Sequence, residues 1–373
     1  MPVLDLTDTS AVDRYDAFVR SHPHRAITQD RQWGVVKNDW GQEAVYLEES
    51  GEIVAAMTLL VRRLPGGFTV LYAPRGPLVD WSDKALVHRI LAEADPLVKK
   101  HRAIMLRIDP EIRFDAELDA WMRDQSGWVV KNVGAQKDEV IQPRYNMVVS
   151  LRDEQGALLS EDALMAKYNS TARRMVRNAR KKGVEVGHGR SDADLRTFHD
   201  VYTYMGRRNE ITTRGLPYFH RIRDAFEDRT TVATVRHEGD VLASAVTVDY
   251  YGKLYYLYAG SNDTKRNLNP NHLMNHELML WGLGREAQSY DLGGVFEIDE
   301  SDGLYFFKRS LAKTDGVTEL IGEVDIVHNT VLYAALAHLL PRVQHGRRAV
   351  SAAVSQARKK VSARLSGQAG SRK

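Results

Sequence analysis

Two ionisable side chains occupy positions where a folded chain could present them to a ligand. Asp109 follows a short apolar segment and immediately precedes a proline. Side chains at such strand ends often line the edge of a cleft, although an aspartate there can equally satisfy the amides of its own turn as an Asx motif. Lys308 follows the aromatic run 305–307, shortly after the acidic segment 297–302. It is either a functional cation or a solvated surface lysine beside a buried aromatic pair.

Metal and nucleophile chemistry have little support in the sequence. The chain has no cysteine, which excludes thiolate metal sites, disulfides and a cysteine nucleophile. His272 and His276 are spaced i, i+4 on an expected helix, which in principle suits zinc, but the residues between them lack the acid of the metalloprotease motif. We therefore expect hydrogen-bonded or surface histidines and no metal. No Ser-His-Asp triad is evident from the spacing.

Four tyrosines are candidates for lining a cleft: Tyr72, Tyr255, Tyr256 and Tyr258. Alternation along a strand places Tyr256 and Tyr258 on one face and Tyr255 on the other. Core packing explains most aromatic residues in strands, so we expect one of the four to touch a ligand.

A basic run lies in the middle of the chain. Its cations are Lys167, Arg173, Arg174, Arg177, Arg180, Lys181 and Lys182. Such a run is either a solvated helix face or a surface that binds a polyanion, RNA or anionic lipid.

The elements that must position these residues follow a mixed α/β pattern. In the first half we expect a helix over 11–19, strands over 53–61 and 68–72, a helix after Ser82-Asp83, and strands over 103–108, 128–133 and 145–151. In the second half we expect a helix over 162–182, a strand over 184–187, a helix over 192–205, strands over 230–236, 241–249 and 254–259, a helix over 271–286 and a strand over 290–293.

This order of elements occurs twice at similar length, and an antiparallel meander followed by a helix and a strand is the order of N-acetyltransferase-like (GNAT) folds. The sequence therefore predicts an α/β (α+β) fold of two tandem GNAT-like domains. We assign residues 1–148 to the first domain and 149–318 to the second. Residues 319–341, with a strand over 319–327 followed by a helix, could return to the first domain.

Charge is unevenly distributed in the 373-residue chain, whose net charge is +3. The tail over 342–373 carries nine Lys and Arg and no Asp or Glu, so the rest of the chain is net acidic. Apolar residues alternate with these cations, which suits either a membrane-surface helix or a solubilising tail. The N-terminus lacks the apolar core of a secretory signal, and no run approaches the ~20 apolar residues needed to span a bilayer. We expect a cytoplasmic protein.

Several segments together resemble the Fem-type (FemABX) family of peptidoglycan bridge-forming aminoacyltransferases, in its compact form without a coiled-coil arm. The segments are Gln29–Trp33 with Lys37, Tyr72–Pro77 with Asp80, Arg173–Val184, Tyr290–Gly294, Gly303–Lys308 and Glu319–Glu323. Their order and spacing carry the resemblance. It implies two GNAT-like domains with a cleft between them. It also implies transfer of an amino acid from aminoacyl-tRNA to the stem peptide of UDP-MurNAc-pentapeptide or lipid II, with no bound cofactor and aminoacyl-tRNA as co-substrate.

The resemblance also implies roles for particular residues. Lys37 and Arg214, with Tyr218, would hold the diphosphate of the precursor, since two cations from separate segments can neutralise it and arginine can bind it bidentately. Arg208 competes with Arg214 for this role. Lys308 would stabilise the oxyanion or hold a terminal phosphate near the transfer RNA end.

Further roles concern the amine and the RNA. Asp109 would hydrogen-bond the incoming amine or the stem peptide. Tyr72, Tyr256 and Tyr258 would line the substrate cleft. The transfer RNA would contact Arg173, Arg174, Arg177 and Lys181 through its phosphates. Direct attack by the amine, without a covalent enzyme intermediate, is the simpler mechanism.

Two rival functions are an acyl-CoA-dependent GNAT-type N-acyltransferase and a non-catalytic protein that binds RNA or precursor. The first would need a glycine-rich loop before the helix of the second domain, where backbone amides hold a pyrophosphate. Residues 265–272 contain no glycine, and Pro270 removes an amide donor. Acyl-CoA is therefore disfavoured.

Overall fold

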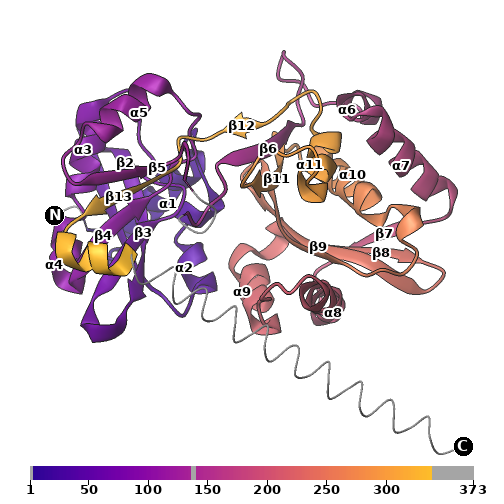
Figure 1. Cartoon of the computed structure of the whole chain (residues 1–373), viewed down its shortest axis with the longest axis horizontal. Coiled ribbons are helices and arrows are strands. Elements are labelled where there is room, and N and C mark those ends of the chain that lie inside the picture. The colour runs from indigo at the N-terminus through magenta and orange to yellow at the C-terminus, as the bar shows by residue number, and fades with distance from the viewer. Residues whose placement is uncertain (1–2, 136–139, 338–373) are drawn as a thin grey trace, which may run out of the picture.

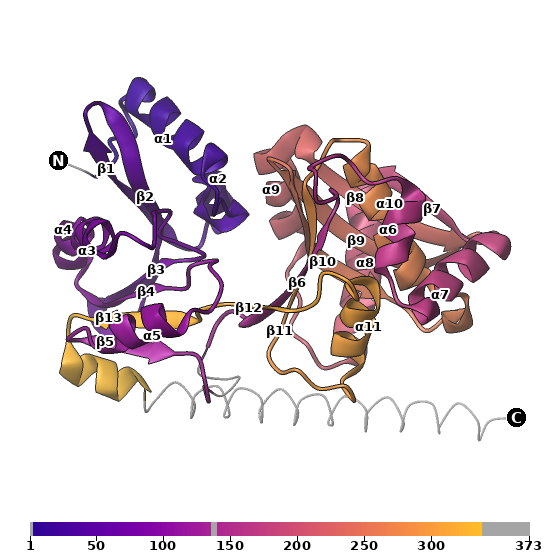
Figure 2. The same ribbon diagram turned by 90° about the horizontal axis from the view of Figure 1, so that it is seen from above.

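The computed structural model describes residues 3–135 and 140–337. Within them the chain forms two α/β halves, each built on one β-sheet, which stand side by side (Figure 1). Figure 2 shows the same halves from above, with a linking segment that passes from one sheet to the other. The predicted basic tail, 342–373, lies outside the described residues.

The first sheet consists of β1 (Gly41–Glu49), β2 (Glu52–Arg63), β3 (Thr69–Ala73), β4 (Ala103–Ile108), β5 (Trp128–Lys131) and β13 (Glu323–Val327). Their order across the sheet is β1-β2-β3-β4-β13-β5. Strands β3 and β4 are parallel, and the other neighbours are antiparallel.

The helices of the first half are α1 (Thr9–Ser21), α2 (Gln32–Val36), α3 (Lys84–Ala92), α4 (Asp95–His101) and α5 (Ala116–Arg123), with 3-10 turns at Ile27–Gln29 and Pro65–Gly67. The helix predicted after Ser82-Asp83 is α3. It begins there because the Asp83 carboxylate accepts a hydrogen bond from the Leu86 amide at 2.9 Å, which satisfies one of the free amides of the first turn.

The second sheet consists of β6 (Tyr145–Ser150), β7 (Glu185–Gly189), β8 (Thr230–His237), β9 (Asp240–Tyr250), β10 (Lys253–Ser261), β11 (Ser289–Val295) and β12 (Thr318–Glu319). Their order is β12-β6-β11-β10-β9-β8-β7. Strands β8, β9 and β10 form the predicted antiparallel meander, and β11 pairs with β10 in parallel.

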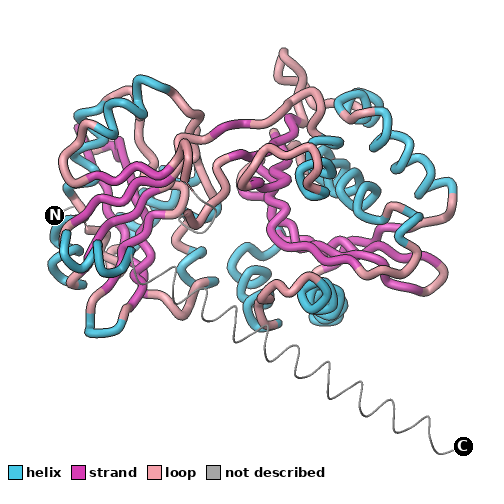
Figure 3. Tube along the Cα trace, in the orientation of Figure 1, coloured by secondary structure: helices cyan, strands magenta, loops and turns pink. Residues whose placement is uncertain are grey.

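The helices of the second half are α6 (Glu161–Lys167), α7 (Ser170–Lys181), α8 (Asp192–Arg208), α9 (Leu216–Phe226), α10 (Pro270–Leu283) and α11 (Gly303–Leu311), with 3-10 turns at Glu227–Arg229 and Arg266–Leu268. They cover both faces of the sheet, with α8 and α9 on one side and α7 and α10 on the other (Figure 3).

The single helix predicted over 162–182 is wrong, because the structure divides it into α6 and α7. Tyr168 adopts an extended backbone, with ψ of 159°. The side chain of Asn169 then accepts a hydrogen bond from the Ala172 amide at 2.8 Å and starts a new helix. Asparagine is a strong N-cap residue, so the local capping preference interrupts the continuous helical pattern.

The two halves repeat one arrangement. In each, three antiparallel strands are followed by a helical crossover and a parallel strand. In the first half, the strands β1, β2 and β3 are followed by the helices α3 and α4 and then by β4. In the second half, the strands β8, β9 and β10 are followed by the helix α10 and then by β11. Parallel neighbours need such a crossover. The prediction of an α/β fold with two tandem GNAT-like domains is confirmed.

The strand predicted over 319–327 is wrong as one element. Its first part is β12, at the edge of the second sheet, and its last part is β13, between β4 and β5 of the first. Gly322, with φ of 99°, lies between them in a conformation that favours glycine. Asp325 of β13 receives two hydrogen bonds from the buried Arg107 of β4, at 2.6 and 2.8 Å. Residues 330–337 form a helix against the first half. The proposed domain limits at 148 and 318 stay a prediction.

Candidate functional site

An apolar cluster crosses the boundary between the two halves and brings α2 against α9. The Trp33 ring lies 6.4 Å from that of Phe226, measured between centroids. The Arg221 Nε donates a hydrogen bond to the Val36 carbonyl at 3.1 Å. The end of α2 is therefore held beside the start of α9, which places side chains from two distant segments together.

Two cations and two tyrosines meet at this junction. The Lys37 ammonium lies 5.3 Å from the ring centroid of Tyr218, and the Arg214 guanidinium lies 5.3 Å from the same ring. The hydroxyls of Tyr218 and Tyr258 are 3.1 Å apart. Burial, and then the charge of Arg214, lower the pKa of Lys37 to about 8. Neither cation forms an ion pair within the part of the chain that the structure describes, so the pair can accept an anionic ligand.

Arg208, the competing choice, lies outside this group. Its guanidinium forms an ion pair with Asp263 at 2.6 Å, near the end of α8. Because that charge is already neutralised, the geometry favours Arg214 over Arg208 as the partner of Lys37.

The predicted arrangement of the β10 tyrosines is wrong, because the strand contains a β-bulge. Consecutive residues of β9 pair with Tyr256 and Tyr258, which leaves Leu257 as an extra residue. A bulge reverses the alternation of side chains. Tyr258 therefore packs on the same face as Tyr255, whereas Tyr256 packs in the other core, 6.1 Å from Tyr290 between ring centroids. Only Tyr258 of these two reaches the Lys37 junction.

Asp109 is a buried carboxylate at the end of β4. It accepts a hydrogen bond from the Tyr72 hydroxyl at 3.0 Å and one from the Arg75 amide at 2.6 Å. These hydrogen-bond donors come from the end of β3 and the residues after it, not from the turn of Asp109 itself, which contradicts the Asx interpretation. Burial raises the pKa of Asp109 to about 7, against the opposing charge of Arg75. Such a carboxyl group can exchange a proton near neutral pH. Tyr72, predicted to line the cleft, is itself buried and orients Asp109.

Lys308 is buried, not solvated, with 7% of the residue exposed. Its Nζ donates a hydrogen bond to the Gly294 carbonyl at 2.9 Å. Gly294 ends an irregular stretch of β11 in which Gly293 has φ of 75°. Burial lowers the pKa of Lys308 to about 8, and the charges of Asp291 and Asp302 oppose this shift. A largely desolvated ammonium near an acidic residue is suited to act on a charged reaction centre.

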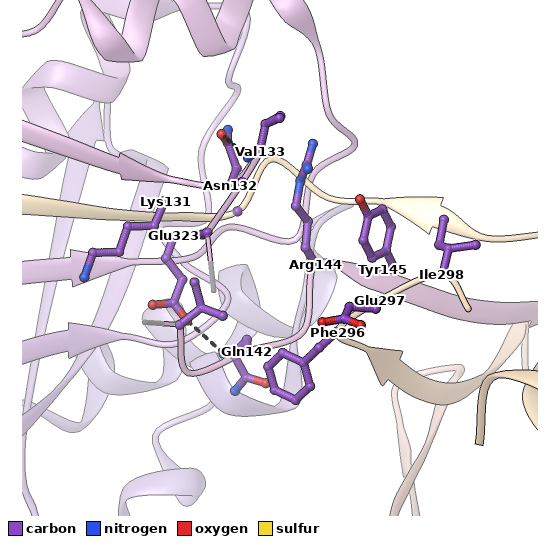
Figure 4. Close-up of a pocket in the computed structure, with 14 residues that line it drawn as sticks. Lys131, Asn132, Val133, Gln142, Arg144, Tyr145, Phe296, Glu297, Ile298 and Glu323 are labelled. Carbon is purple, nitrogen blue, oxygen red and sulfur yellow. Dashed lines mark hydrogen bonds between the residues drawn. The ribbon is translucent and has the colours of Figure 1, made fainter. Parts of the chain in front are cut away.

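Glu323 is a further candidate, which was not among the site residues predicted from the sequence. It is buried, accepts a hydrogen bond from the Gln142 amide at 2.8 Å, and lies 3.3 Å from the Arg107 guanidinium. Burial raises its pKa, and its charge in turn raises that of Asp109. Figure 4 shows Glu323 and Gln142 beside a cavity of 320 Å³ that Arg144, Tyr145 and Phe296 also line. The segment Glu319–Glu323, already used for the family resemblance, was the available signal.

The cations of the basic helix α7 have different surroundings. The Arg173 guanidinium donates a hydrogen bond to the Tyr168 carbonyl at 2.7 Å and so closes the end of α6. Arg174, Arg177 and Lys181 are exposed and lie three and four residues apart, which places them on one face. These three have no ion pair among the described residues.

The histidine pair has separate protein partners. His272 lies 3.3 Å from the Ser310 hydroxyl. His276 is buried between the Tyr168 hydroxyl, at 3.0 Å, and the Glu161 carboxylate, at 3.1 Å. Residues 3–135 and 140–337 contain no group of three or more ligating side chains placed to hold a metal. None of the helices in these ranges is both long enough and apolar enough to span a bilayer.

The repeated crossover arrangement and the buried groups at the junction define a tandem GNAT-like protein with a candidate site where the halves meet. Two blocks of the chain, residues 11–238 and 233–340, match the FemAB family. The chain belongs to the FemAB family.

Individual proteins that resemble this chain support the family assignment. The chain is 37% identical over 341 residues to a UDP-N-acetylmuramoylpentapeptide-lysine N(6)-alanyltransferase of Weissella viridescens, covering 90% of this chain and 99% of the relative. It is 25% identical to a lipid II:glycine glycyltransferase of Staphylococcus haemolyticus, covering 90% and 96%. The crystal structure of FemX matches with a TM-score of 0.78 and 24% identity, over 90% of this chain and 100% of that one.

Proposed function

We propose that this protein is an aminoacyltransferase that moves an amino acid from aminoacyl-tRNA to the stem peptide of a peptidoglycan precursor, UDP-MurNAc-pentapeptide or lipid II. The observation that carries the proposal is the Lys37 and Arg214 pair, supplied by the two halves and lacking an ion-pair partner in the described chain. Both precursors contain a diphosphate, which two convergent cations bind well. The names of the relatives from Weissella and Staphylococcus support the same class of acceptor.

The buried groups support a direct acyl transfer. The acceptor amine must be neutral to attack the ester carbonyl, and we assign to Asp109, whose pKa is about 7, the role of accepting its proton. Attack forms the new carbon–nitrogen bond and a tetrahedral oxyanion, which the Lys308 ammonium stabilises. The carbon–oxygen bond of the ester then breaks, and the ribose oxygen leaves with a proton.

The donor would dock on the second half. Arg174, Arg177 and Lys181 present three exposed charges on one face of α7, and phosphate contacts of this kind supply affinity without reading sequence. We place the reaction on the cytoplasmic side of the membrane, where aminoacyl-tRNA is made. The tail over 342–373 could add contact with anionic lipid when the acceptor is lipid II.

The test is transfer of radiolabelled amino acids from a mixed aminoacyl-tRNA pool to UDP-MurNAc-pentapeptide and to lipid II, side by side. Label should enter at least one acceptor with wild-type protein and be lost with Lys308→Ala. Absence of transfer to both acceptors, across stem peptides with different third residues, would overturn the proposal. Transfer from acyl-CoA would establish the GNAT-type alternative, and binding without transfer from any donor would establish a non-catalytic role.

A further inference from the structure

Lys253 connects the two halves through two carboxylates. It is the first residue of β10 in the second half. Its Nζ forms ion pairs with Glu111, which follows β4 in the first half, and with Asp291 of β11 at 3.2 Å. The ammonium also lies 4.6 Å from the ring centroid of Tyr255. Burial lowers the pKa of Lys253. The opposing effect of Glu111, Tyr255 and Asp291 is larger, so the pKa is raised overall and the side chain stays charged.

Asp291 connects this cation to the segment that holds Lys308. One carboxylate oxygen of Asp291 accepts a hydrogen bond from the Gly293 amide at 2.7 Å, and the other accepts one from the Asn146 side chain at 3.2 Å. These bonds shape the irregular stretch of β11 that ends at Gly294. The carbonyl of Gly294 in turn accepts the hydrogen bond from Lys308.

Glu111 connects the same cation to the other side of the candidate site. It lies two residues beyond Asp109, on the segment that leaves β4. A continuous series of contacts therefore runs from the Asp109 segment through Glu111, Lys253 and Asp291 to the backbone that holds Lys308. Asp109 and Glu111 are joined by the chain itself through Pro110. The steps from Glu111 to Asp291 are ion pairs, and hydrogen bonds connect Asp291 to Gly293 and Gly294 to Lys308.

We propose that Lys253 is a positioning residue, which fixes the spacing between Asp109 on the first half and Lys308 on the second. This inference rests on the proposed function. It assigns Lys253 no contact with substrate. Its effect is exerted through Glu111 and Asp291, which belong to the segments that carry Asp109 and hold Lys308.

The surroundings of the ion pair argue for this role over general support of the fold. A cavity of 360 Å³ lies at the boundary, lined by Glu111 and Asn146 among others, so packing alone does not set the spacing there. The halves are also joined elsewhere. Arg25 donates a hydrogen bond to the Tyr251 carbonyl at 2.8 Å, and the Tyr250 hydroxyl donates one to Asp30 at 3.0 Å. Loss of the Lys253 contacts should therefore change the spacing without separating the halves.

The test compares Lys253→Met, Lys253→Arg and wild type in transfer from aminoacyl-tRNA to the acceptor that wild type uses. Since misplacement of reacting groups by about 1 Å can reduce rates about 100-fold, we expect kcat of Lys253→Met to fall between about tenfold and 100-fold. The KM for acceptor should stay within about twofold, because binding of the diphosphate is untouched. Lys253→Arg keeps the charge and should recover most of the rate. Lys253→Met alone leaves the Glu111 carboxylate without its partner. The double variant Lys253→Met with Glu111→Gln removes that charge, so it should fold normally and still have the reduced kcat.

Arg25→Gln is the matched control. It removes a contact between the halves at the same β9–β10 turn but touches neither Glu111 nor Asp291. Its kcat should stay close to wild type. A second control is non-additivity. In the Lys308→Ala background, Lys253→Met should have little further effect, because it acts through Lys308.

Two further measurements separate positioning from stability. The negative charges of Asp291 and Asp302 raise the pKa of Lys308. Lys253→Met removes the positive charge beside Asp291 and should therefore raise the pKa of Lys308 further. The alkaline limb of the pH–rate profile should then move to higher pH. Because the chain has no cysteine, spin labels can be attached at Ala92→Cys and Asn178→Cys, on exposed positions of the two halves. The distribution of distances between them should broaden in Lys253→Met and not in Lys253→Arg.

The outcomes are distinguishable. If wild type transfers no amino acid, the proposed function fails, and the distance measurement alone then decides whether Lys253 fixes the spacing. If wild type is active and Lys253→Met resembles Arg25→Gln in rate, pH profile and distances, the inference is overturned and the proposed function stands.

Discussion

The hydroxyl of Tyr218 lies 3.1 Å from that of Tyr258, and two cations from different halves of the molecule each lie 5.3 Å from the centroid of the Tyr218 ring. Lys37 comes from the end of α2 and Arg214 from the residue before the N-cap of α9. Bringing two like charges together, one of them largely buried, is unfavourable unless an anion joins them. Burial and the charge of Arg214 both disfavour the charged form of Lys37, which lowers its pKa. The junction is therefore prepared for an anionic ligand.

This junction allows the two competing arginines to be distinguished. Lys37→Ala and Arg214→Ala should each raise the KM for acceptor about 10-fold to 100-fold, because a charge-assisted hydrogen bond contributes about 1.5–3 kcal/mol. Steady-state kinetics with the active acceptor checks this. Arg208→Ala, which removes a cation already paired with Asp263, should leave the KM within about twofold. A larger effect from Arg208→Ala than from Arg214→Ala would reverse the assignment.

Lys308→Ala should lower kcat by about 100-fold to 1000-fold, the usual effect of losing one group that stabilises an oxyanion. The KM for acceptor should change little, since the interaction forms only in the transition state. The measurement is single-turnover transfer with saturating substrates. Arg309→Ala is a suitable control, because the Arg309 guanidinium donates to the Ala312 and Lys313 carbonyls at the end of α11. An unchanged single-turnover rate in Lys308→Ala would contradict the role.

The pH dependence should follow the two buried groups. Asp109, with a pKa of about 7, must be ionised to accept a proton, and Lys308, with a pKa of about 8, must be protonated to act as a cation. The profile of kcat at saturating acceptor should therefore rise near pH 7 and fall near pH 8. Saturation is needed because the pKa of Lys37, which binds the acceptor, is also about 8. Lys308→Arg should lose the alkaline limb, because arginine stays charged. A flat profile between pH 6 and 9 would exclude both assignments.

The raised pKa of Asp109 also predicts that stability depends on pH. Because the folded pKa of Asp109 lies above its ordinary value of 3.8, the folded state holds this proton more tightly than the unfolded state does. Its contribution to the free energy of unfolding is full at low pH and is lost as the pH rises through about 7. Asp109→Asn removes this dependence. Chemical denaturation at several pH values should show the variant gaining stability relative to wild type towards pH 8, and the reverse trend would refute burial as the cause.

The exposed face of α7 should act on the donor only. Reversal of charge at Arg174, Arg177 and Lys181 should weaken the use of aminoacyl-tRNA and reduce the salt dependence of its KM by about one unit of log–log slope per residue. Binding of the acceptor should be unaffected. Arg173→Glu is expected to behave differently, because Arg173 closes the end of α6 and its loss should lower thermal stability. Equal loss of donor and acceptor binding in the triple variant would contradict the docking surface.

The return of the chain to the first sheet rests on Asp325. This buried carboxylate receives hydrogen bonds from Arg107 and from the Tyr333 hydroxyl, the latter at 2.8 Å. Asp325→Ala should destabilise the protein by about 3–5 kcal/mol, because the buried Arg107 guanidinium loses both hydrogen bonds to Asp325 and keeps only Glu323 as a carboxylate partner. Urea unfolding measures this. Glu117→Ala, which breaks an exposed pair with Lys84, should cost less than about 1 kcal/mol. Equal effects would show that Asp325 is not a structural anchor.

Much of this protein could be predicted from local sequence. The apolar periodicity and the cap at Asp83 predicted part of the element order, and its repetition predicted the paired GNAT-like fold. The strand β1 and the helices α5, α9 and α11 were not predicted. The ordered segments from Gln29 to Glu323 gave the family. The elements depend on residues close in sequence, and the resemblance depends on the order of segments within this one chain, so the sequence alone contains both.

The tertiary structure decided what depends on distant contacts or on one irregular residue. An extra residue at Leu257 reverses the faces of the β10 tyrosines, and Asn169 divides a helix whose pattern is continuous. The choice between Arg208 and Arg214 follows from the position of Asp263. The contact of Lys253 with Glu111 joins residues 142 positions apart, and the shifted pKa values of Asp109 and Lys308 come mainly from burial. Sequence determines which side chains exist and which elements they form, whereas only folding fixes which charges are desolvated and which partners they meet.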